Sequence, residues 1–146
     1  KNQIISCAAF GDTIIKKAKT MHTQHNVGVA EKIGKYSDGI EVPAGARWLM
    51  TSGTPGVNAE GVLPADFASQ ATLAWENMLR LLAAAGMGVE DIVKITQTLT
   101  RREDLEVYRP IRSKFLGESR PASMLSFVSE LIWPEVLFEL EVIAAK

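Results

Sequence analysis

Two glutamates near the end of the chain have the residue type and the spacing that suit chemistry on water. Glu139 and Glu141 alternate with Phe138, Leu140 and Val142, which is the two-residue period of a β-strand. Both carboxylates should therefore project from one face of the strand, roughly 7 Å apart. If that face lines a cleft, desolvation and mutual repulsion raise one pKa, and that carboxyl group becomes a general acid or base. The alternative, which the spacing by itself favours, is a solvated strand face.

Other side chains suit the binding of a small ligand. Tyr36 lies in a turn rich in glycine and serine, where its phenol either closes over a ligand or anchors its own loop. Arg109 and Arg112 are three residues apart on an expected helix and share a face that suits either an anion or solvent.

His22 and His25 have a spacing that two metal ligands can use, but no third ligand lies nearby. We expect no metal and no cofactor, because the sequence has no phosphate loop, nucleophile elbow or zinc pattern.

The composition is that of one soluble domain. The 146 residues are 47% hydrophobic and 23% charged, and a chain of this length buries roughly two-thirds of its unfolded surface. The single cysteine, Cys7, excludes an internal disulfide and favours a reducing compartment, so we expect a cytoplasmic protein. No apolar run reaches the roughly 18 residues of a membrane span, and we expect no contact with membranes.

Residues 1–20 differ from the rest of the chain in charge. They hold four lysines and one aspartate, a net charge of +3, which leaves −4 for residues 21–146. The segment has no apolar core followed by a small-residue cleavage site, so it is not typical of a signal peptide. We interpret residues 1–20 as an N-terminal extension or a cloning remnant, and residues 21–146 as one domain.

The first half of the domain is expected to contain three strands and one long helix. The pattern predicts a short strand pair over 33–42, a buried strand over 47–52 and a loop over 54–64. Asp66 should cap the helix, and Gly86 should end it. The apolar positions expected to face the core are Phe67, Ala71, Ala74, Met78, Leu81 and Ala85.

The second half is expected to hold three strands and a second helix. Strands are predicted over 92–100, 123–129 and 135–144. The helix over 105–116 should fall into two pieces, because Pro110 cannot donate a helical hydrogen bond. This order of elements predicts an α+β fold in which one sheet carries two helices on one face. Its other face then needs a cover, either partner subunits or the rest of its own core.

Several short motifs follow one another in a characteristic order. They are Gly-Lys-Tyr-Ser-Asp-Gly at 34–39, Leu-Met-Thr-Ser-Gly at 49–53, Ala-Ala-Ala-Gly at 83–86 with Glu-Asp-Ile-Val-Lys at 90–94, Arg-Pro-Ala-Ser at 120–123 and Phe-Glu-Leu-Glu-Val-Ile-Ala at 138–144. Together they cover about residues 30–145 and resemble the RidA family, also called the YjgF or endoribonuclease L-PSP family. The resemblance implies the chorismate-mutase-like α+β fold, a homotrimer and small-molecule clefts between neighbouring subunits.

The resemblance also implies an activity and a departure from it. Well-understood members of the family hydrolyse enamines and imines, such as 2-aminoacrylate, to a keto acid and ammonia without a cofactor. In these proteins an arginine after the Pro-Ala pair clamps the substrate carboxylate, and this chain has Ser123 there. A hydroxyl group cannot neutralise a carboxylate, so we expect 2-aminoacrylate not to be the substrate.

The remaining family positions are carried over one by one. The second helix of the family presents an asparagine and a tyrosine to the cleft, and we assign these positions to Arg109 and Arg112. The cysteine that follows the clamp two residues later is replaced by Leu125. The family pattern retains Tyr36 as a lid. It also retains Thr51 and Ser52 at the edge of the cleft, and Glu139 with Glu141 to orient water.

Three functions remain open at this point. The first is a trimer that binds a small metabolite and hydrolyses an enamine or imine, and the second is a non-enzymatic metabolite-sensing or regulatory trimer. The third, an endoribonuclease or translation inhibitor, has the least support. Residues 21–146 are acidic and lack the interleaved basic and aromatic side chains that hold RNA, so we expect no binding of nucleic acid.

Overall fold

A mixed β-sheet forms the centre of the computed structural model, which describes residues 22–146. Its strands are β3 (Trp48–Met50), β7 (Phe138–Ala145), β5 (Ile92–Leu99) and β6 (Ala122–Phe127), in that order across the sheet, and β4 (Thr54–Pro55) also pairs with β7. The β5–β6 pair is parallel, and the other pairs are antiparallel. β4 lies within the segment predicted as a loop, because pairing with β7 supplies hydrogen bonds that the local sequence does not reveal.

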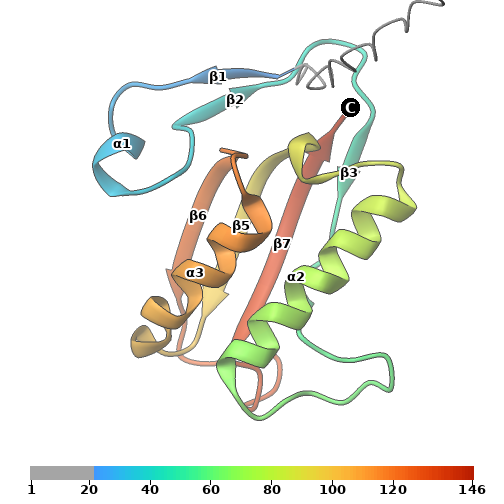
Figure 1. The fold of residues 1–146 in the computed structure, drawn as a ribbon, viewed down its shortest axis with the longest axis vertical. Coiled ribbons are helices and arrows are strands. Elements are labelled where there is room, and N and C mark those ends of the chain that lie inside the picture. The colour runs from blue at the N-terminus through green and yellow to red at the C-terminus, as the bar shows by residue number, and fades with distance from the viewer. Residues whose placement is uncertain (1–21) are drawn as a thin grey trace, which may run out of the picture.

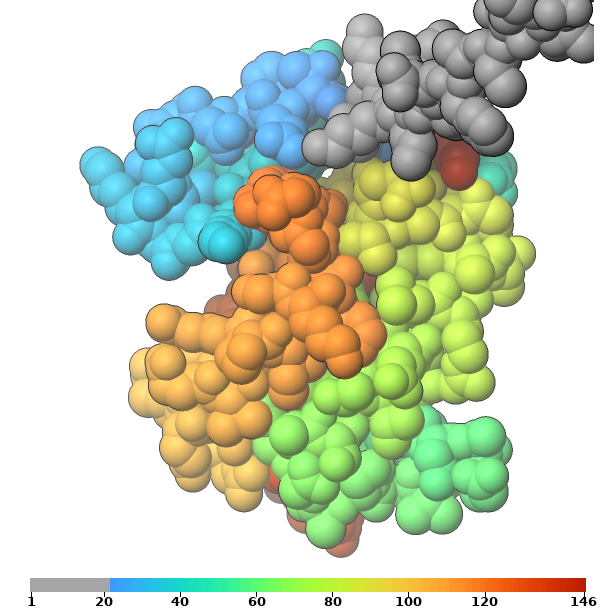
Figure 2. All heavy atoms as spheres, in the orientation of Figure 1, coloured from blue at the N-terminus to red at the C-terminus, as the bar shows by residue number. Residues whose placement is uncertain are grey.

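Two helices cover one face of this sheet, as predicted. α2 (Phe67–Ala84) and α3 (Leu105–Leu116) lie side by side in front of the strands in Figure 1, and Figure 2 shows the same face as a closely filled surface. Trp75, Tyr108 and Phe138 are the largest side chains of the core between the layers. The α+β fold with both helices on one face is therefore confirmed.

The ends of α2 are those predicted, but its buried face is turned slightly. The Asp66 carboxylate accepts a hydrogen bond of 2.8 Å from the Ser69 amide, and Gly86 adopts a φ of 67° after the last turn. Leu81 was expected in the core but is 39% exposed, and Leu82 is buried in its place. Leu82 lies seven residues after the large Trp75, so both side chains lie on one side of the helix.

The prediction that α3 falls into two pieces is wrong. The helix is continuous from Leu105 to Leu116 with Pro110 inside it, and a short 3-10 turn, η2 (Arg102–Asp104), precedes it. The carbonyl that loses its partner to the proline is that of Glu106, four residues earlier. Glu106 is exposed, so water can satisfy this carbonyl without breaking the helix. A similar turn, η1 (Val89–Asp91), precedes β5.

The first described segment forms a separate ribbon above the sheet (Figure 1). β1 (Thr23–His25) pairs with β2 (Gly39–Glu41), and the helical turn α1 (Ala30–Ile33) lies between them. The strand pair predicted within 33–42 is therefore wrong, since the partner of β2 is β1. The Asp38 carboxylate accepts hydrogen bonds from the amides of Val27, Val29 and Ala30, which lower its pKa.

The predictions for residues 1–20 and for membrane spans depend on which residues the structure describes. The interpretation of residues 1–20 lies outside the described residues. In the part from 22 to 146, no helix has both the length and the apolar character needed to cross a membrane.

Candidate functional site

The two glutamates of β7 share one face of the sheet, as their spacing predicts. Glu139 pairs in register with Thr98 of β5, and Glu141 pairs with Thr96. The alternate residues of β7, such as Leu140, are buried beneath the helices, so both carboxylates lie on the opposite face. Glu139 is half-buried and Glu141 is exposed. The two side chains therefore differ in environment, and Glu139 has the better shielded position.

Glu139 is half-buried because the backbone of the β3–β4 connection approaches it closely. A Cβ atom at Gly53 would lie 2.5 Å from Cδ of Glu139 and 2.7 and 2.8 Å from its two oxygens. A side chain at this position would require the Glu139 carboxylate to move away. Ser52 precedes this glycine in the chain and is exposed. We call Ser52, Gly53 and Glu139 the glutamate half-site.

Thr51 has a structural role beside this half-site. Its amide donates to the Val142 carbonyl at 3.0 Å, and its Oγ1 accepts a hydrogen bond of 2.9 Å from the Val142 amide. These bonds continue the pairing of β3 with β7 beyond the last residue of β3. The hydroxyl oxygen of Thr51 is therefore engaged with the backbone, and Ser52 is the better placed of the two predicted residues for a ligand.

Ser123 lies on the other face of the sheet, beneath α3. Its Oγ accepts a hydrogen bond of 2.9 Å from Nε2 of Gln97, which is completely buried. The Gln97 Oε1 accepts hydrogen bonds from the Tyr108 hydroxyl at 2.8 Å and from Arg112 Nε at 3.1 Å. Gln97 Nε2 also donates to the Met124 carbonyl at 2.9 Å, so all four hydrogen-bonding positions of the amide are used. Ser123 is thus part of a buried polar network centred on Gln97.

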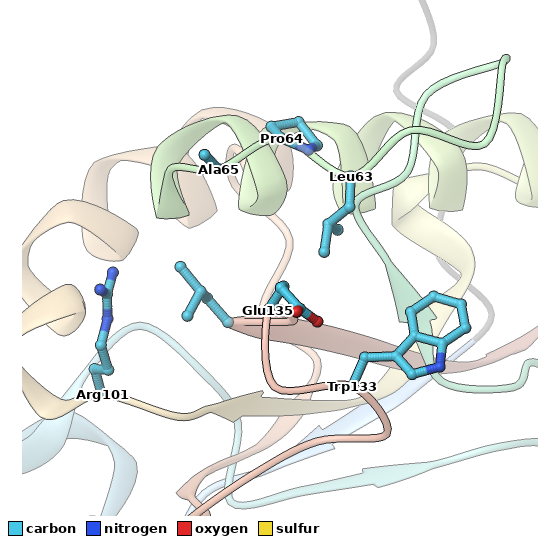
Figure 3. Close-up of a pocket in the computed structure, with 7 residues that line it drawn as sticks. Leu63, Pro64, Ala65, Arg101, Trp133 and Glu135 are labelled. Carbon is cyan, nitrogen blue, oxygen red and sulfur yellow. The ribbon is translucent and has the colours of Figure 1, made fainter.

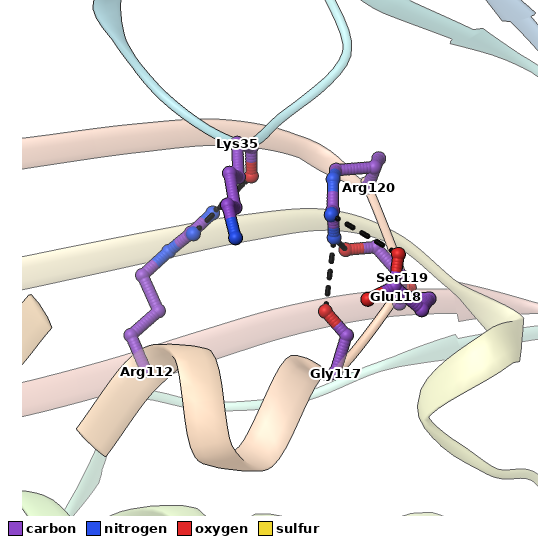
Figure 4. A network of polar contacts seen from close by, with 6 residues as sticks. All are labelled: Lys35, Arg112, Gly117, Glu118, Ser119 and Arg120. Atoms are coloured by element: carbon purple, nitrogen blue, oxygen red, sulfur yellow. Dashed lines mark hydrogen bonds and ion pairs between the residues drawn. The ribbon is translucent and has the colours of Figure 1, made fainter. Parts of the chain in front are cut away.

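Arg112 connects this network to the loop that carries Tyr36. Its two terminal nitrogens donate to the Lys35 carbonyl at 3.2 and 3.3 Å, as Figure 4 shows. The same loop is held to the start of β6, since the Ser37 hydroxyl donates to the Arg120 carbonyl at 2.6 Å. The half-buried Tyr36 is therefore fixed near the strand that carries Ser123. We call Tyr36, Arg112 and Ser123 the serine half-site.

Burial shifts the pKa of Arg112 in this half-site and that of Tyr108 beside it. Desolvation lowers the pKa of the Arg112 guanidinium, and nearby Arg120 lowers it further, while Tyr108 acts in the opposite direction. Arginine nevertheless stays charged at neutral pH because its ordinary pKa is so high. Burial raises the pKa of the Tyr108 phenol, which therefore remains a neutral donor to Gln97.

Arg109 does not accompany Arg112, although the sequence places the two on one helix face that suits either an anion or solvent. Its side chain is 66% exposed and lies 3.5 Å from a carboxylate oxygen of Glu106. Three helical residues leave two side chains about 60° apart around the axis. This angle is enough for Arg112 to reach Gln97 while Arg109 points into solvent.

Gln97 and Tyr108 are functional candidates that the sequence reasoning missed. Gln97 occupies a core-facing position between Ile95 and Leu99 in the alternating pattern of β5. A polar residue at such a position needs buried partners, so this break in the pattern is a signal that could have identified it. Tyr108 gave no such signal, because a tyrosine fits the core of a helix-covered sheet.

The two half-sites do not meet within one chain. Ser123 faces the helices, whereas Glu139 projects from the opposite face of the same sheet. A separate cavity of about 520 Å³ lies elsewhere, between the loop before α2 and the loop before β7 (Figure 3). Its lining residues are Leu63, Pro64, Ala65, Arg101, Trp133, Glu135 and Leu137, none of which belongs to either half-site.

The two histidines considered as metal ligands have other partners. His22 Nε2 lies 2.8 Å from the Ala145 carbonyl, and His25 Nε2 lies 2.7 Å from a Glu41 carboxylate oxygen. Among residues 22–146 there is no group of three or more His, Cys, Asp or Glu side chains that could hold a metal ion.

Comparison with known proteins agrees with this fold and these motifs. The family model described as endoribonuclease L-PSP matches residues 23–146. A RutC family protein of Pyrococcus abyssi is 32% identical over 116 residues, covering 78% of this chain and 88% of the relative. The 2-iminobutanoate/2-iminopropanoate deaminase of Escherichia coli K12 is 31% identical over 133 residues, covering 88% of this chain and 98% of that enzyme.

Solved structures give the same result. The E. coli protein TdcF with bound serine has a TM-score of 0.65 at 33% identity, covering 78% of this chain and 90% of TdcF. The Rid family protein YyfB of Yersinia pestis has a TM-score of 0.76 at 23% identity, covering 86% of this chain and 99% of its own, and shows the fold alone. With the family model matched from Thr23 to the last residue, the chain belongs to the RidA, or endoribonuclease L-PSP, family.

Proposed function

We propose that this protein forms a homotrimer that binds a small metabolite in clefts between subunits and hydrolyses an enamine or imine there. The observation that carries the proposal is the separation of the two half-sites. Glu139 and Ser123 lie on opposite faces of one sheet, so the glutamate half-site of one copy needs the serine half-site of a neighbour. The names of the relatives, among them an imine deaminase, support the same class of reaction.

The proposed reaction assigns the water to Glu139. The carboxylate accepts a proton from water as the water oxygen adds to the carbon of the protonated imine (C=NH2+), which gives a neutral carbinolamine. The glutamic acid then protonates the amino group. As ammonia leaves, the carboxylate accepts the hydroxyl proton while the C=O bond forms, and this proton leaves with the ammonia as ammonium. Glu139 suits this role better than Glu141, because it is half-buried against Gly53 whereas Glu141 is exposed.

The serine half-site sets which substrate enters. Ser123 stands where the family resemblance places a carboxylate-clamping arginine, and its Oγ is already an acceptor for Gln97. The hydroxyl hydrogen of Ser123 remains available to donate to a ligand. Tyr36, held by its loop beside Ser123, would cover the bound molecule. A monocarboxylate such as 2-aminoacrylate lacks its family partner here, so the proposed substrate is a different imine or enamine.

The open face of the sheet supports the trimer. Trp48 is 51% exposed, Met50 is 73% exposed and Met124 is 55% exposed. All three alternate with core-facing neighbours, so they lie on the sheet face that the helices leave uncovered. Burying large apolar side chains against partner subunits is a strong driving force for association.

Met50→Asp should break this assembly. We expect the wild-type protein to sediment with three times the mass of the 15.9 kDa chain, and the variant to sediment mainly as smaller species, because a charge would be buried in the interface. Leu81→Asp is the matched control, since Leu81 is a partly exposed leucine on the helix side. Sedimentation equilibrium measures both, and an unchanged trimer in Met50→Asp would contradict the proposed interface.

A direct test of the activity follows ammonia and keto acid released from imines that an amino-acid oxidase generates in situ. All of these imines carry the carboxylate that Ser123 cannot clamp, so the assay also includes imines without a carboxylate, which an amine oxidase generates from amines. The wild type should accelerate hydrolysis of at least one imine of the two sets but not of 2-aminoacrylate. Ser123→Arg by itself should gain little activity on 2-aminoacrylate. Ser123 and Arg112 both bind the side chain of Gln97, so the new guanidinium would lie close to that of Arg112 and be repelled by it. The double variant Ser123→Arg/Arg112→Gln removes this repulsion and should gain activity on 2-aminoacrylate, whereas Ser113→Arg, on the exposed side of α3, should not.

The outcomes separate the two functional classes. Wild-type turnover of 2-aminoacrylate would mean that the substrate assignment is wrong. If the wild type and every variant leave all imines unchanged, hydrolysis is excluded. Saturable metabolite binding without product would then favour the metabolite-sensing trimer, which the missing clamp also supports.

A further inference from the structure

Three cationic residues, Lys35, Arg112 and Arg120, come together where the Tyr36 loop meets α3 and the start of β6, and Arg112 binds Lys35 through the backbone carbonyl. Figure 4 shows the Arg112 guanidinium reaching from α3 toward Lys35 on the loop, with Arg120 beside them. Arg120 is close enough to lower the pKa of Arg112 further, and its own side chain is 25% exposed. We call Lys35, Arg112 and Arg120 the cation cluster.

The cluster has too few negative charges to balance it. In the part of the chain that the structure describes, no carboxylate pairs with Lys35 or Arg112. Among residues 22–146, Arg120 pairs only with Glu118, at 3.4 Å, and the Glu118 side chain is 88% exposed to solvent. Three positive charges thus face one well-hydrated negative charge. Holding like charges together at a partly desolvated position costs free energy, and a bound anion removes that cost.

Donors remain available within the cluster. The guanidinium of Arg112 has five N–H groups, of which one on Nε binds Gln97 and one on each terminal nitrogen binds the Lys35 carbonyl. One N–H on each terminal nitrogen has no partner among the described residues. Arg120 differs, since its guanidinium mainly caps the end of α3 by donating to the Gly117 and Ser119 carbonyls, both at 2.9 Å. Arg112 and Lys35 are therefore the groups that can reach a ligand.

We propose that the cation cluster is an anion-binding site for small molecules that carry two negative charges on oxygen. A site with an excess of about two positive charges favours a dianion over a monoanion. The cluster adjoins Tyr36 and, through Gln97, Ser123, so the inference rests on the proposed ligand cleft and names the class of molecule that enters it. It requires binding only, and does not depend on hydrolysis.

Calorimetric titration at low ionic strength tests this site with three defined probes: malonate, inorganic phosphate and acetate. We expect malonate and phosphate to compete with each other, and malonate to bind about tenfold more tightly than acetate. Arg112→Gln should remove this preference. Arg109→Gln is the matched control, because it removes the same charge from the same helix at an exposed position and should bind as the wild type does.

Two further measurements keep the test decisive. Thermal unfolding shows whether Arg112→Gln is folded, and Lys35→Gln, at an exposed position that cannot disturb the core, should weaken malonate binding about threefold. Equal affinity for malonate and acetate, or a preference that survives both substitutions, would overturn the site. Malonate binding without phosphate binding would overturn the proposal that the site selects molecules by their two negative charges. Malonate binding in a protein that hydrolyses no imine would leave this site standing while refuting the proposed reaction.

Discussion

Glu139→Gln should reduce imine hydrolysis by about 100-fold or more, measured as kcat/KM for keto-acid release from the imine that the wild type hydrolyses best. Glutamine keeps the size of the side chain and one hydrogen-bonding oxygen, but it cannot accept a proton from water. The position is half-buried against Gly53, and the neutral amide fits the same space. We therefore expect the variant to fold and to form the same oligomer as the wild type.

Glu141→Gln provides the matched control for this experiment. It removes the same charge from the same strand face, but from an exposed position two residues away. Its kcat/KM should remain within about threefold of the wild-type value, because a solvated carboxylate contributes little at a distance. Equal losses of kcat/KM in both variants would mean that the two carboxylates act together, and not Glu139 alone. Full activity in Glu139→Gln would refute the assignment of the water to this carboxylate.

Gly56→Ala should destabilise the fold strongly, because the added methyl group would meet the backbone of α2. A Cβ at this buried position would lie 1.9 Å from the Gln70 carbonyl oxygen and 2.6 Å from the Gln70 Cα, which are backbone atoms of α2. A helix backbone cannot move aside as a flexible side chain can, so the loop after β4 and α2 must separate. We expect the free energy of unfolding to fall by about 3 kcal/mol or more, or the protein not to fold.

Gly39→Ala is the control for this substitution. Among the atoms that the structure describes, its Cβ would meet only the His25 Cβ, at 3.9 Å, which is ordinary van der Waals contact. Denaturant titration should therefore give nearly the wild-type midpoint for Gly39→Ala and a much lower one for Gly56→Ala. A Gly56→Ala protein with wild-type stability would show that the loop does not approach α2 this closely.

Local patterns in the sequence determined most of the framework. The two-residue period placed Glu139 and Glu141 on one face of β7, and the 3.6-residue period together with Asp66 and Gly86 placed α2. The ordered motifs identified the family. These features are encoded over a few neighbouring residues, because backbone hydrogen bonding in a strand or a helix repeats at a fixed interval.

The tertiary structure alone decided which side chains meet. Arg112 reaches Gln97, 15 residues away, and the Lys35 carbonyl, 77 residues away, while Arg109 on the same helix reaches neither. The sequence likewise did not show that Ser123 and Glu139 lie on opposite sides of one sheet, or that Gly56 contacts α2. Contacts between distant segments depend on strand order, helix rotation and the space left in the core, and no local period specifies these quantities.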